Sequence, residues 1–307
     1  MMTLFSAAAL AISQLTAPGP SGPLEGTLIN AGKGTPVVII ISGSGPTDRD
    51  GNNPMGVTAQ PYKLLAEALA SSGVSSVRID KRGMFGSKAA IPDPNAVTIA
   101  AYAADAHAWA KSARAATGAP CVWLVGHSEG GLVALKAGQD RSDLCGIVTV
   151  SAMGRRFGAV LREQLKSNPA NAPILDPALS ALDALEVGRE VDPATLPVPL
   201  LALFNKPVQP YLIDLMSQDS AALAGTLELP LLVVQGDRDF QVQVADAEAL
   251  ARAQPRAKLV VAAGVNHVLK TVASDDRAAN AATYGDPSLP VAPTVVDAIA
   301  GFVKATR

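Results

Sequence analysis

The residues best able to do chemistry surround a serine, in the Gly-His-Ser-Glu-Gly motif of residues 126–130. An apolar run over residues 122–125 precedes the motif, and a helix-like run follows it. The pattern predicts a strand, a sharp turn with Ser128 at its apex, and a helix. Glycines on both sides let the backbones approach closely, so that a strained turn presents the Ser128 hydroxyl to a substrate. The N–H of Glu129 would then point at a developing oxyanion.

A nucleophilic serine needs a base, and the chain has three histidines from which to choose. His127 belongs to the serine motif and is expected to be a packing residue, because it cannot easily turn to serve its neighbour. His107 lies in an alanine-rich helical stretch and is expected on a helix surface or at the edge of the core. His267 follows the apolar run of residues 259–263 in a short glycine-containing loop, and we predict that it is the base.

The base needs an acid to orient it, and two aspartates follow the strand-like residues 230–235. Asp239 fits a Gly-x-x-Asp-x-x-Val spacing after this strand, and we predict that it is the acid. Asp237 is expected to cap the turn or to pair with Arg238 at the surface.

A second oxyanion donor is expected from the glycine-rich loop of residues 42–52. The loop follows residues 37–41, whose continuous apolar run predicts a strand buried on both faces. We expect the Ser44 N–H to be the donor. In the Asp-Arg-Asp run of residues 48–50, the carboxylates are expected to brace the loop through backbone N–H groups and Arg49 to pair with one of them. The alternatives are a solvated charge cluster and an Arg49 that binds a substrate carboxylate.

Taken together, Ser128, Asp239 and His267 resemble the catalytic residues of the α/β-hydrolase superfamily, and the resemblance spans the chain from about Leu24 onward. Finer strings are similar to the bacterial esterase D-like carboxylesterases, also described as serine aminopeptidase-like hydrolases. These strings are residues 42–51, 78–83, 208–212 and 266–270. The resemblance implies hydrolysis of short-chain carboxylic esters by a Ser-His-Asp triad through an acyl-enzyme. One departure is Ser42, which stands where many lipases have a histidine before the oxyanion glycine.

The length and patterning of the chain predict an α/β fold, and the resemblance implies that it is the α/β-hydrolase fold. Its 307 residues allow one large α/β domain with an insertion. Strand and helix signals alternate, which indicates a mostly parallel central sheet with helices on both faces. The expected strands are residues 27–30, 37–41, 76–80, 121–125, 146–150, 231–235 and 258–262, and the expected helices are residues 61–72, 98–117, 130–137, 244–254 and 292–304.

Residues 153–227 interrupt this alternation with leucines at loosely helical spacing and frequent prolines. We predict a helical cap inserted after the sixth strand, covering the serine, between core segments 24–152 and 228–307. The alternative is a long surface insertion with no role in substrate choice. Tyr211 and Phe204 are candidates for the pocket, although aromatics at such spacing more often belong to a core.

The N-terminal residues 1–23 are predicted to be a signal-like or disordered segment. Residues 4–12 are apolar and alanine-rich and precede a Pro/Gly-rich stretch, as in a secretory signal, but no lysine or arginine comes before them. An exported protein, periplasmic or secreted, is favoured, and a cytoplasmic protein is the alternative. Cys121 and Cys145 begin two strands expected to be neighbours, so a disulfide and two buried thiols both fit.

Composition limits the partners. A net charge of −2 gives no electrostatic case for nucleic acid. No metal-ligand spacing and no phosphate loop is found, so no metal or other cofactor is expected. The N-terminal apolar run is too short to span a bilayer. The expected partner is a small-molecule ester.

Other functions stay open. The first is a peptidase or amidase acting on small N-terminal residues, with Glu186, Glu190 or Asp214 binding the α-amine. The second is a non-catalytic binding protein of the hydrolase fold, and the third is an acyltransferase.

Overall fold

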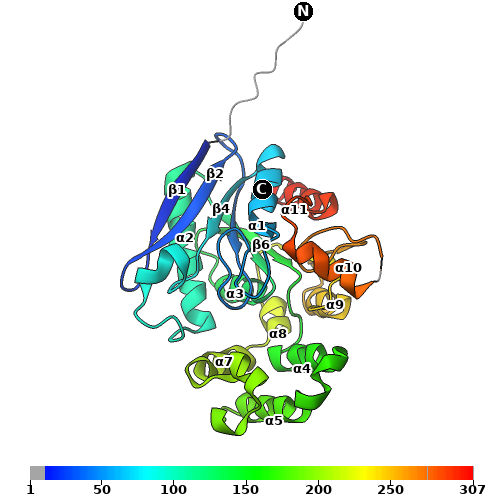
Figure 1. The fold of residues 1–307 in the computed structure, drawn as a ribbon. Coiled ribbons are helices and arrows are strands. Elements are labelled where there is room, and N and C mark those ends of the chain that lie inside the picture. Colours follow the sequence, from blue (N-terminus) through cyan, green and yellow to red (C-terminus); the bar gives the residue numbers. More distant parts are fainter. Residues whose placement is uncertain (1–10, 275, 307) are drawn as a thin grey trace, which may run out of the picture.

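The computed structural model describes residues 11–274 and 276–306, and within them eight strands form one sheet in the order β1-β2-β4-β3-β5-β6-β7-β8 (Figure 1). The six strands from β3 to β8 run parallel to one another. Strands β1 and β2 form an antiparallel hairpin, and β2 pairs antiparallel with β4. The strands are β1 (Ala11–Pro18), β2 (Pro23–Asn30), β3 (Val37–Ile41), β4 (Ser75–Ile79), β5 (Val122–His127), β6 (Leu144–Val150), β7 (Leu231–Gly236) and β8 (Lys258–Ala262).

Helices cover both faces of the sheet, as the α/β alternation predicts. One apolar cluster joins the sheet to α2, α3 and α9, and a second joins it to α1 and α11. The helices of these layers are α1 (Pro61–Ser71), α2 (Ile99–Thr117), α3 (Glu129–Ala137), α9 (Val244–Ala253) and α11 (Pro293–Ala305). A short helix, α10 (Arg277–Ala282), follows the last strand.

Strand β3 shows why the buried strands read as continuous apolar runs. Every residue of the strand is buried. Val37, Ile39 and Ile41 belong to the cluster on one face, and Val38 and Ile40 belong to the cluster on the other. Alternate side chains thus enter two different cores, so neither face tolerates a polar residue.

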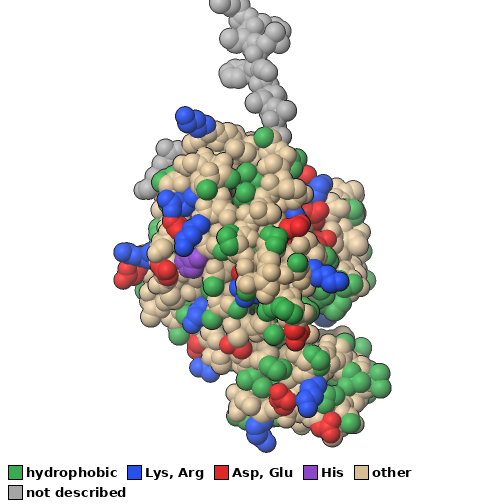
Figure 2. Space-filling view, turned by 90° about the vertical axis from the view of Figure 1, so that its left-hand side faces the viewer, with side chains coloured by type: hydrophobic (Ala, Val, Ile, Leu, Met, Phe, Trp, Pro, Cys, Tyr) green, Lys and Arg blue, Asp and Glu red, His purple; other side chains and the backbone are tan. Residues whose placement is uncertain are grey.

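A helical segment lies between β6 and β7, where the sequence predicts a cap. Its helices are α4 (Phe157–Ser167), α5 (Leu175–Glu186), α6 (Leu201–Phe204), α7 (Gln209–Ser217) and α8 (Ser220–Gly225). Figure 1 shows α4, α5 and α7 grouped at one end of the molecule, away from the sheet, and Figure 2 shows this group as a separate lobe. The segment has an apolar cluster of its own, which includes Leu182, Leu185 and Phe204. Phe204 is therefore a core residue of the segment.

The N-terminal segment differs from the prediction. Residues 1–10 lie outside the described part of the chain, but residues 11–18 are not disordered, because they form the edge strand β1. Its register runs from Ala11 opposite Asn30 to Pro18 opposite Pro23. Most β1 side chains are exposed, and only Leu15 and Ala17 pack against the core. Backbone pairing rather than an apolar pattern holds this strand, which is why the sequence gives little sign of it.

A disulfide joins Cys121 and Cys145, whose Cα atoms are 5.2 Å apart. Cys121 immediately precedes β5, and Cys145 is the second residue of β6. The bridge resolves the alternatives that the sequence leaves open. It lies at the amino-terminal ends of these parallel strands, opposite the end of the sheet that carries Ser128.

Candidate active site

Ser128 occupies a strained turn between β5 and α3. Its backbone angles are φ 54° and ψ −121°, a region that side chains other than glycine rarely adopt. A side chain at Gly126 would collide with the Gly130 carbonyl, and one at Gly130 would collide with the Ile41 carbonyl. The two glycines therefore allow strand, helix and neighbouring loop to meet around Ser128, which remains partly exposed.

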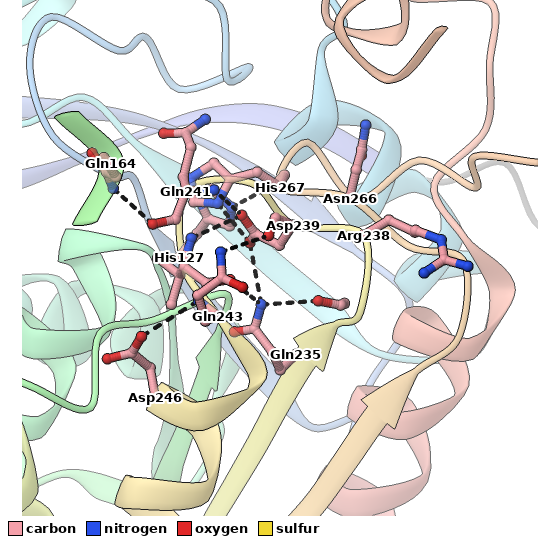
Figure 3. A network of polar contacts seen from close by, with 12 residues as sticks. His127, Gln164, Gln235, Arg238, Asp239, Gln241, Gln243, Asp246, Asn266 and His267 are labelled. Carbon is pink, nitrogen blue, oxygen red and sulfur yellow. Dashed lines mark hydrogen bonds and ion pairs between the residues drawn. The ribbon is translucent and has the colours of Figure 1, made fainter. Parts of the chain in front are cut away.

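Asp239 and His267 lie together, close to His127 at the end of β5 (Figure 3). Nδ1 of His267 is 2.8 Å from Oδ2 of Asp239. The other oxygen, Oδ1, accepts the N–H groups of Gln241 at 2.8 Å and Val242 at 2.9 Å. Burial alone would raise the pKa of Asp239, but His267 and these two N–H donors outweigh it and hold the pKa below its usual value. Asp239 is thus a carboxylate, Nδ1 donates to it, and Nε2 of His267 is left to accept a proton.

The other aspartate of this loop, Asp237, has a structural contact. Its Oδ1 accepts the Gly264 N–H at 2.7 Å, and Gly264 lies in the loop after β8. Asp237 therefore ties the two loops that carry Asp239 and His267, which is more than the local cap that the sequence suggests.

His127 is more than the packing residue that the sequence predicts. Its Nε2 is 2.8 Å from the carbonyl oxygen of His267, and its Nδ1 is 2.9 Å from the Tyr62 hydroxyl. That hydroxyl accepts the Gly43 N–H at 3.1 Å. Burial, and after it the nearby His267, lowers the pKa of His127 to about 3, so the ring is neutral. Nε2 must then donate to the carbonyl and Nδ1 must accept from Tyr62.

These hydrogen bonds form a directed chain from Gly43 through Tyr62 and His127 to the backbone of His267. It connects the glycine-rich loop to the loop that holds the expected base, and it passes through His127, the residue before Ser128. The rings of His127 and His267 have centroids 4.6 Å apart, so His267 packs against the residue that precedes Ser128. The third histidine, His107, is partly buried on α2 and contacts the Ala137 carbonyl, at the core edge where it was expected.

The two backbone N–H groups predicted as oxyanion donors belong to Glu129 and Ser44. Glu129 is the first residue of α3, so its N–H has no acceptor within the helix. In the glycine-rich loop, Gly43 already donates to Tyr62, which leaves the N–H of Ser44 as the next one along the chain. The loop is close to the turn, since a Cβ on Gly43 would be 3.1 Å from Cβ of Ser128. Lys81 holds this loop by donating from Nζ to the Gly43 carbonyl at 2.6 Å.

The charged run of residues 48–50, within this loop, is partly as predicted. Oδ1 of Asp48 accepts the N–H groups of Asp50 at 2.9 Å and Asn52 at 2.8 Å, which confirms the bracing role. The predicted pairing of Arg49 with a neighbouring aspartate is wrong. Arg49 instead pairs with Asp80 at 2.6 Å, because β4 ends beside the loop. This pairing engages the guanidinium in the fold and disfavours its use for a substrate carboxylate.

A cavity of about 610 Å³ opens next to Ser44 and Glu129. One wall comes from loops at the sheet edge and the other from the helical segment. Most of its lining is apolar, for example Met84, Val97, Phe157, Leu203, Val208 and Leu215. Tyr211 also lines it, as predicted. The cavity therefore begins at the two expected oxyanion donors and extends under the helical segment.

Sequence reasoning missed the polar side chains of this cavity. Glu129 was considered only for its N–H, yet its side chain lines the cavity together with Lys81. The acidic residues predicted to bind a substrate α-amine, Glu186, Glu190 and Asp214, do not line the cavity. Glu186 pairs with Arg162, and Asp214 accepts the N–H of Ile99. The position of Glu129 directly after Ser128 was the available signal.

Within residues 11–274 and 276–306, no group of three or more His, Cys, Asp or Glu side chains is placed to hold a metal ion. Over the same residues, no helix combines the length and the apolar character that crossing a membrane requires.

The strained serine turn, the parallel sheet and the helical layers are typical of α/β-hydrolases, and comparison with known families assigns the chain to the same class. Residues 38–282 match the model of the alpha/beta hydrolase family, and the chain belongs to that family. It is 27% identical to esterase EstD of Thermotoga maritima over 265 residues, and the aligned region covers 83% of this chain. The chain spans 57% of the length of that relative.

Solved structures of low sequence identity share the fold. Est1E from Butyrivibrio proteoclasticus superposes with a TM-score of 0.59 at 17% identity, covering 95% of this chain and 98% of the other. A thermophilic esterase from Thermogutta terrifontis gives a TM-score of 0.57 at 19% identity, covering 96% and 99%. A puromycin-hydrolyzing peptidase of Mycobacterium tuberculosis gives 0.59 at 16% identity, covering 99% of this chain and 41% of the other.

Proposed function

We propose that the protein is a serine carboxylesterase that hydrolyses short-chain carboxylic esters through Ser128, His267 and Asp239. The observation that carries the proposal is the buried His267–Asp239 hydrogen bond of 2.8 Å beside a serine in a strained strand–helix turn. The similarity to esterases supports the same reaction.

The reaction follows from the protonation states at this site. Nε2 of His267 takes the proton of Ser128 as the hydroxyl oxygen attacks the ester carbonyl. Asp239 keeps Nδ1 protonated and stabilises the imidazolium that forms. The N–H groups of Ser44 and Glu129 bind the oxyanion, and each such donor is typically worth about 3–4 kcal/mol. His267 then protonates the departing alcohol, and water, activated by the same histidine, releases the acid from the acyl-enzyme.

The test is hydrolysis of p-nitrophenyl esters from acetyl to decanoyl, with amino-acid p-nitroanilides measured alongside. The wild type should hydrolyse the short esters, and Ser128→Ala and His267→Gln should not. His107→Gln is the matched control, since it removes a histidine outside the site. Cleavage of anilides alone would replace the proposal by a peptidase. Ligand binding without turnover of either series would replace it by a binding protein.

We also propose that the protein works in an oxidising compartment after export. The Cys121–Cys145 disulfide supports this, because such bonds persist mainly in secreted and periplasmic proteins. Fractionation of cells that express the native gene tests it. Recovery in the cytosol with both thiols free would contradict it.

A further inference from the structure

A buried ion pair joins the two segments that carry the predicted oxyanion donors, and the proposed reaction assigns it no role. Nζ of Lys81, in the loop after β4, lies 3.4 Å from Oε1 of Glu129, the first residue of α3. Lys81 is 4% exposed and Glu129 is 1% exposed, so both charges are buried. Replacement of such a pair by apolar residues is often neutral or stabilising, so the fold alone does not require it.

Lys81 also contacts the glycine-rich loop. Its Nζ donates to the Gly43 carbonyl at 2.6 Å, which is short even for a charged donor. The ring of Tyr102 lies against the same ammonium group, with its centroid 5.3 Å from Nζ. A carboxylate, a carbonyl and an aromatic ring therefore hold this group in one position.

The carbonyl that Lys81 engages belongs to the same peptide unit as the Ser44 N–H. This peptide is planar and trans, so its carbonyl and its N–H point in opposite directions. A donor fixed on the carbonyl therefore fixes the direction of the N–H. Tyr62 does not have this effect, because it accepts the Gly43 N–H, which belongs to the preceding peptide unit.

The Ser44 N–H is free for a ligand and lies in the right region. Among residues 11–274 and 276–306, no protein acceptor takes it. Ser44 and Glu129 both line the cavity, and a Cβ on Gly43 would be 3.1 Å from Cβ of Ser128. The peptide that Lys81 holds is thus next to the proposed nucleophile.

We infer that Lys81 is a positioning residue of the oxyanion site, which orients the Gly43–Ser44 peptide and ties it to Glu129. The carboxylate of Glu129 anchors the ammonium group, and the N–H of the same residue is the other predicted donor. One ion pair therefore sets the separation of the two N–H groups. A cation on the carbonyl also polarises the peptide and strengthens its N–H as a donor. The inference rests on the proposed esterase function and adds a residue to its machinery.

The test separates oxyanion stabilisation from substrate binding. Hydrolysis of p-nitrophenyl acetate gives kcat and KM. Trifluoroacetone gives a Ki for a tetrahedral adduct, because Ser128 adds to the ketone and the ketone oxygen becomes an oxyanion. Lys81→Met should lower kcat by about tenfold to hundredfold and change KM by less than about twofold. The Ki for trifluoroacetone should rise by the factor by which kcat falls, since both depend on the same donors.

A double variant, Lys81→Met with Glu129→Gln, separates positioning from folding. It leaves no unpaired buried carboxylate, so its stability to urea should recover in part. It still lacks a donor to the Gly43 carbonyl, so its kcat should stay low and its Ki high. If Lys81→Met alone does not fold, the double variant carries the same comparison.

The matched control is Arg82→Met with Asp105→Asn. This removes a neighbouring pair, 2.6 Å apart and mostly buried, in which Arg82 contacts Asp105 and the Ala101 carbonyl instead of the glycine-rich loop. The control should keep kcat and Ki near the wild-type values, whatever its stability.

Three results would overturn the inference while leaving the esterase proposal intact. One is an unchanged kcat and Ki in the folded Lys81→Met variant. Another is a double variant that regains kcat together with stability. The third is an equal loss of kcat in the Arg82 and Asp105 control, which would mean general loosening. Failure of the wild type to hydrolyse any ester would refute both proposals together.

Discussion

Replacement of Tyr62 by phenylalanine tests the hydrogen-bond chain that runs from Gly43 through Tyr62 and His127 to the backbone of His267. The Tyr62 hydroxyl accepts from the Gly43 N–H and donates to Nδ1 of His127, and all three groups are buried. Phenylalanine has the same ring and no hydroxyl, so the variant removes both hydrogen bonds and leaves the packing of α1 nearly unchanged.

The size of the effect follows from the two groups left without partners. An unsatisfied buried polar group costs about 1–3 kcal/mol, and the gain from not burying the Tyr62 hydroxyl offsets part of the sum. We therefore expect Tyr62→Phe to lower the free energy of unfolding by about 2–4 kcal/mol. The value of kcat should fall about tenfold, because Gly43 precedes the expected oxyanion donor Ser44 and its release would displace that donor. Displacing a donor should lower kcat by less than the roughly 10²–10³-fold seen when a donor is removed.

The assay combines urea unfolding with steady-state kinetics on p-nitrophenyl acetate, and KM should change less than kcat. Tyr284→Phe is the control, since Tyr284 is a partly exposed residue whose hydroxyl contacts only the Gln241 side chain, at 3.2 Å, among the described residues. If Tyr62→Phe were as stable and as active as Tyr284→Phe, the chain would be a geometric coincidence and not a support for the site.

Three further predictions concern buried charges and the disulfide. The pKa of His127 is lowered from 6.5 to about 3 in the folded state. Its contribution to stability is therefore complete above about pH 6.5 and is lost towards pH 3, by about 1.4 kcal/mol per pH unit. Urea unfolding across this range should show a smaller loss of stability on acidification in His127→Gln than in the wild type. Lys81→Met strands the buried Glu129 and should cost about 3–5 kcal/mol by the same measurement, with partial recovery when Glu129→Gln is added. Replacing Cys121 and Cys145 by alanine opens a loop of sequence separation 24 and should lower the free energy of unfolding by about 3–4 kcal/mol. The value of kcat at 25 °C should change little. A large loss of kcat would contradict the placement of the bridge far from the site.

Much of the sheet is predictable because its strands are apolar runs with clear ends. Strands β3 and β8 have the bounds that the sequence predicts. The ends of parallel strands meet at one edge, so the loops that carry Ser128, Asp239 and His267, each predicted to follow a strand, converge there. Strand β1 escapes prediction because its stability comes from pairing with β2, and backbone pairing leaves no periodic signal in side-chain type.

Side-chain partners are much harder to predict than positions. Tyr62 and His127 are 65 residues apart, and nothing in their local sequence indicates a shared hydrogen bond. The same is true of Arg49 and Asp80, whose pairing depends on how a loop lies against the end of β4. Such contacts arise from the three-dimensional approach of elements, which strand and helix patterns do not specify.

The separate apolar cluster of the segment between β6 and β7 has a consequence for how such a protein diversifies. Leu161, Leu182 and Leu185 pack mainly among helices of that segment, whereas Ser128, Asp239 and His267 depend on the sheet and its loops. Mutations that reshape the cavity wall at Leu203 or Val208 therefore act in a core that is separate from the loops of Ser128, Asp239 and His267. Substrate preference can therefore change through substitutions in one segment of the chain while the sheet and its loops keep their sequence.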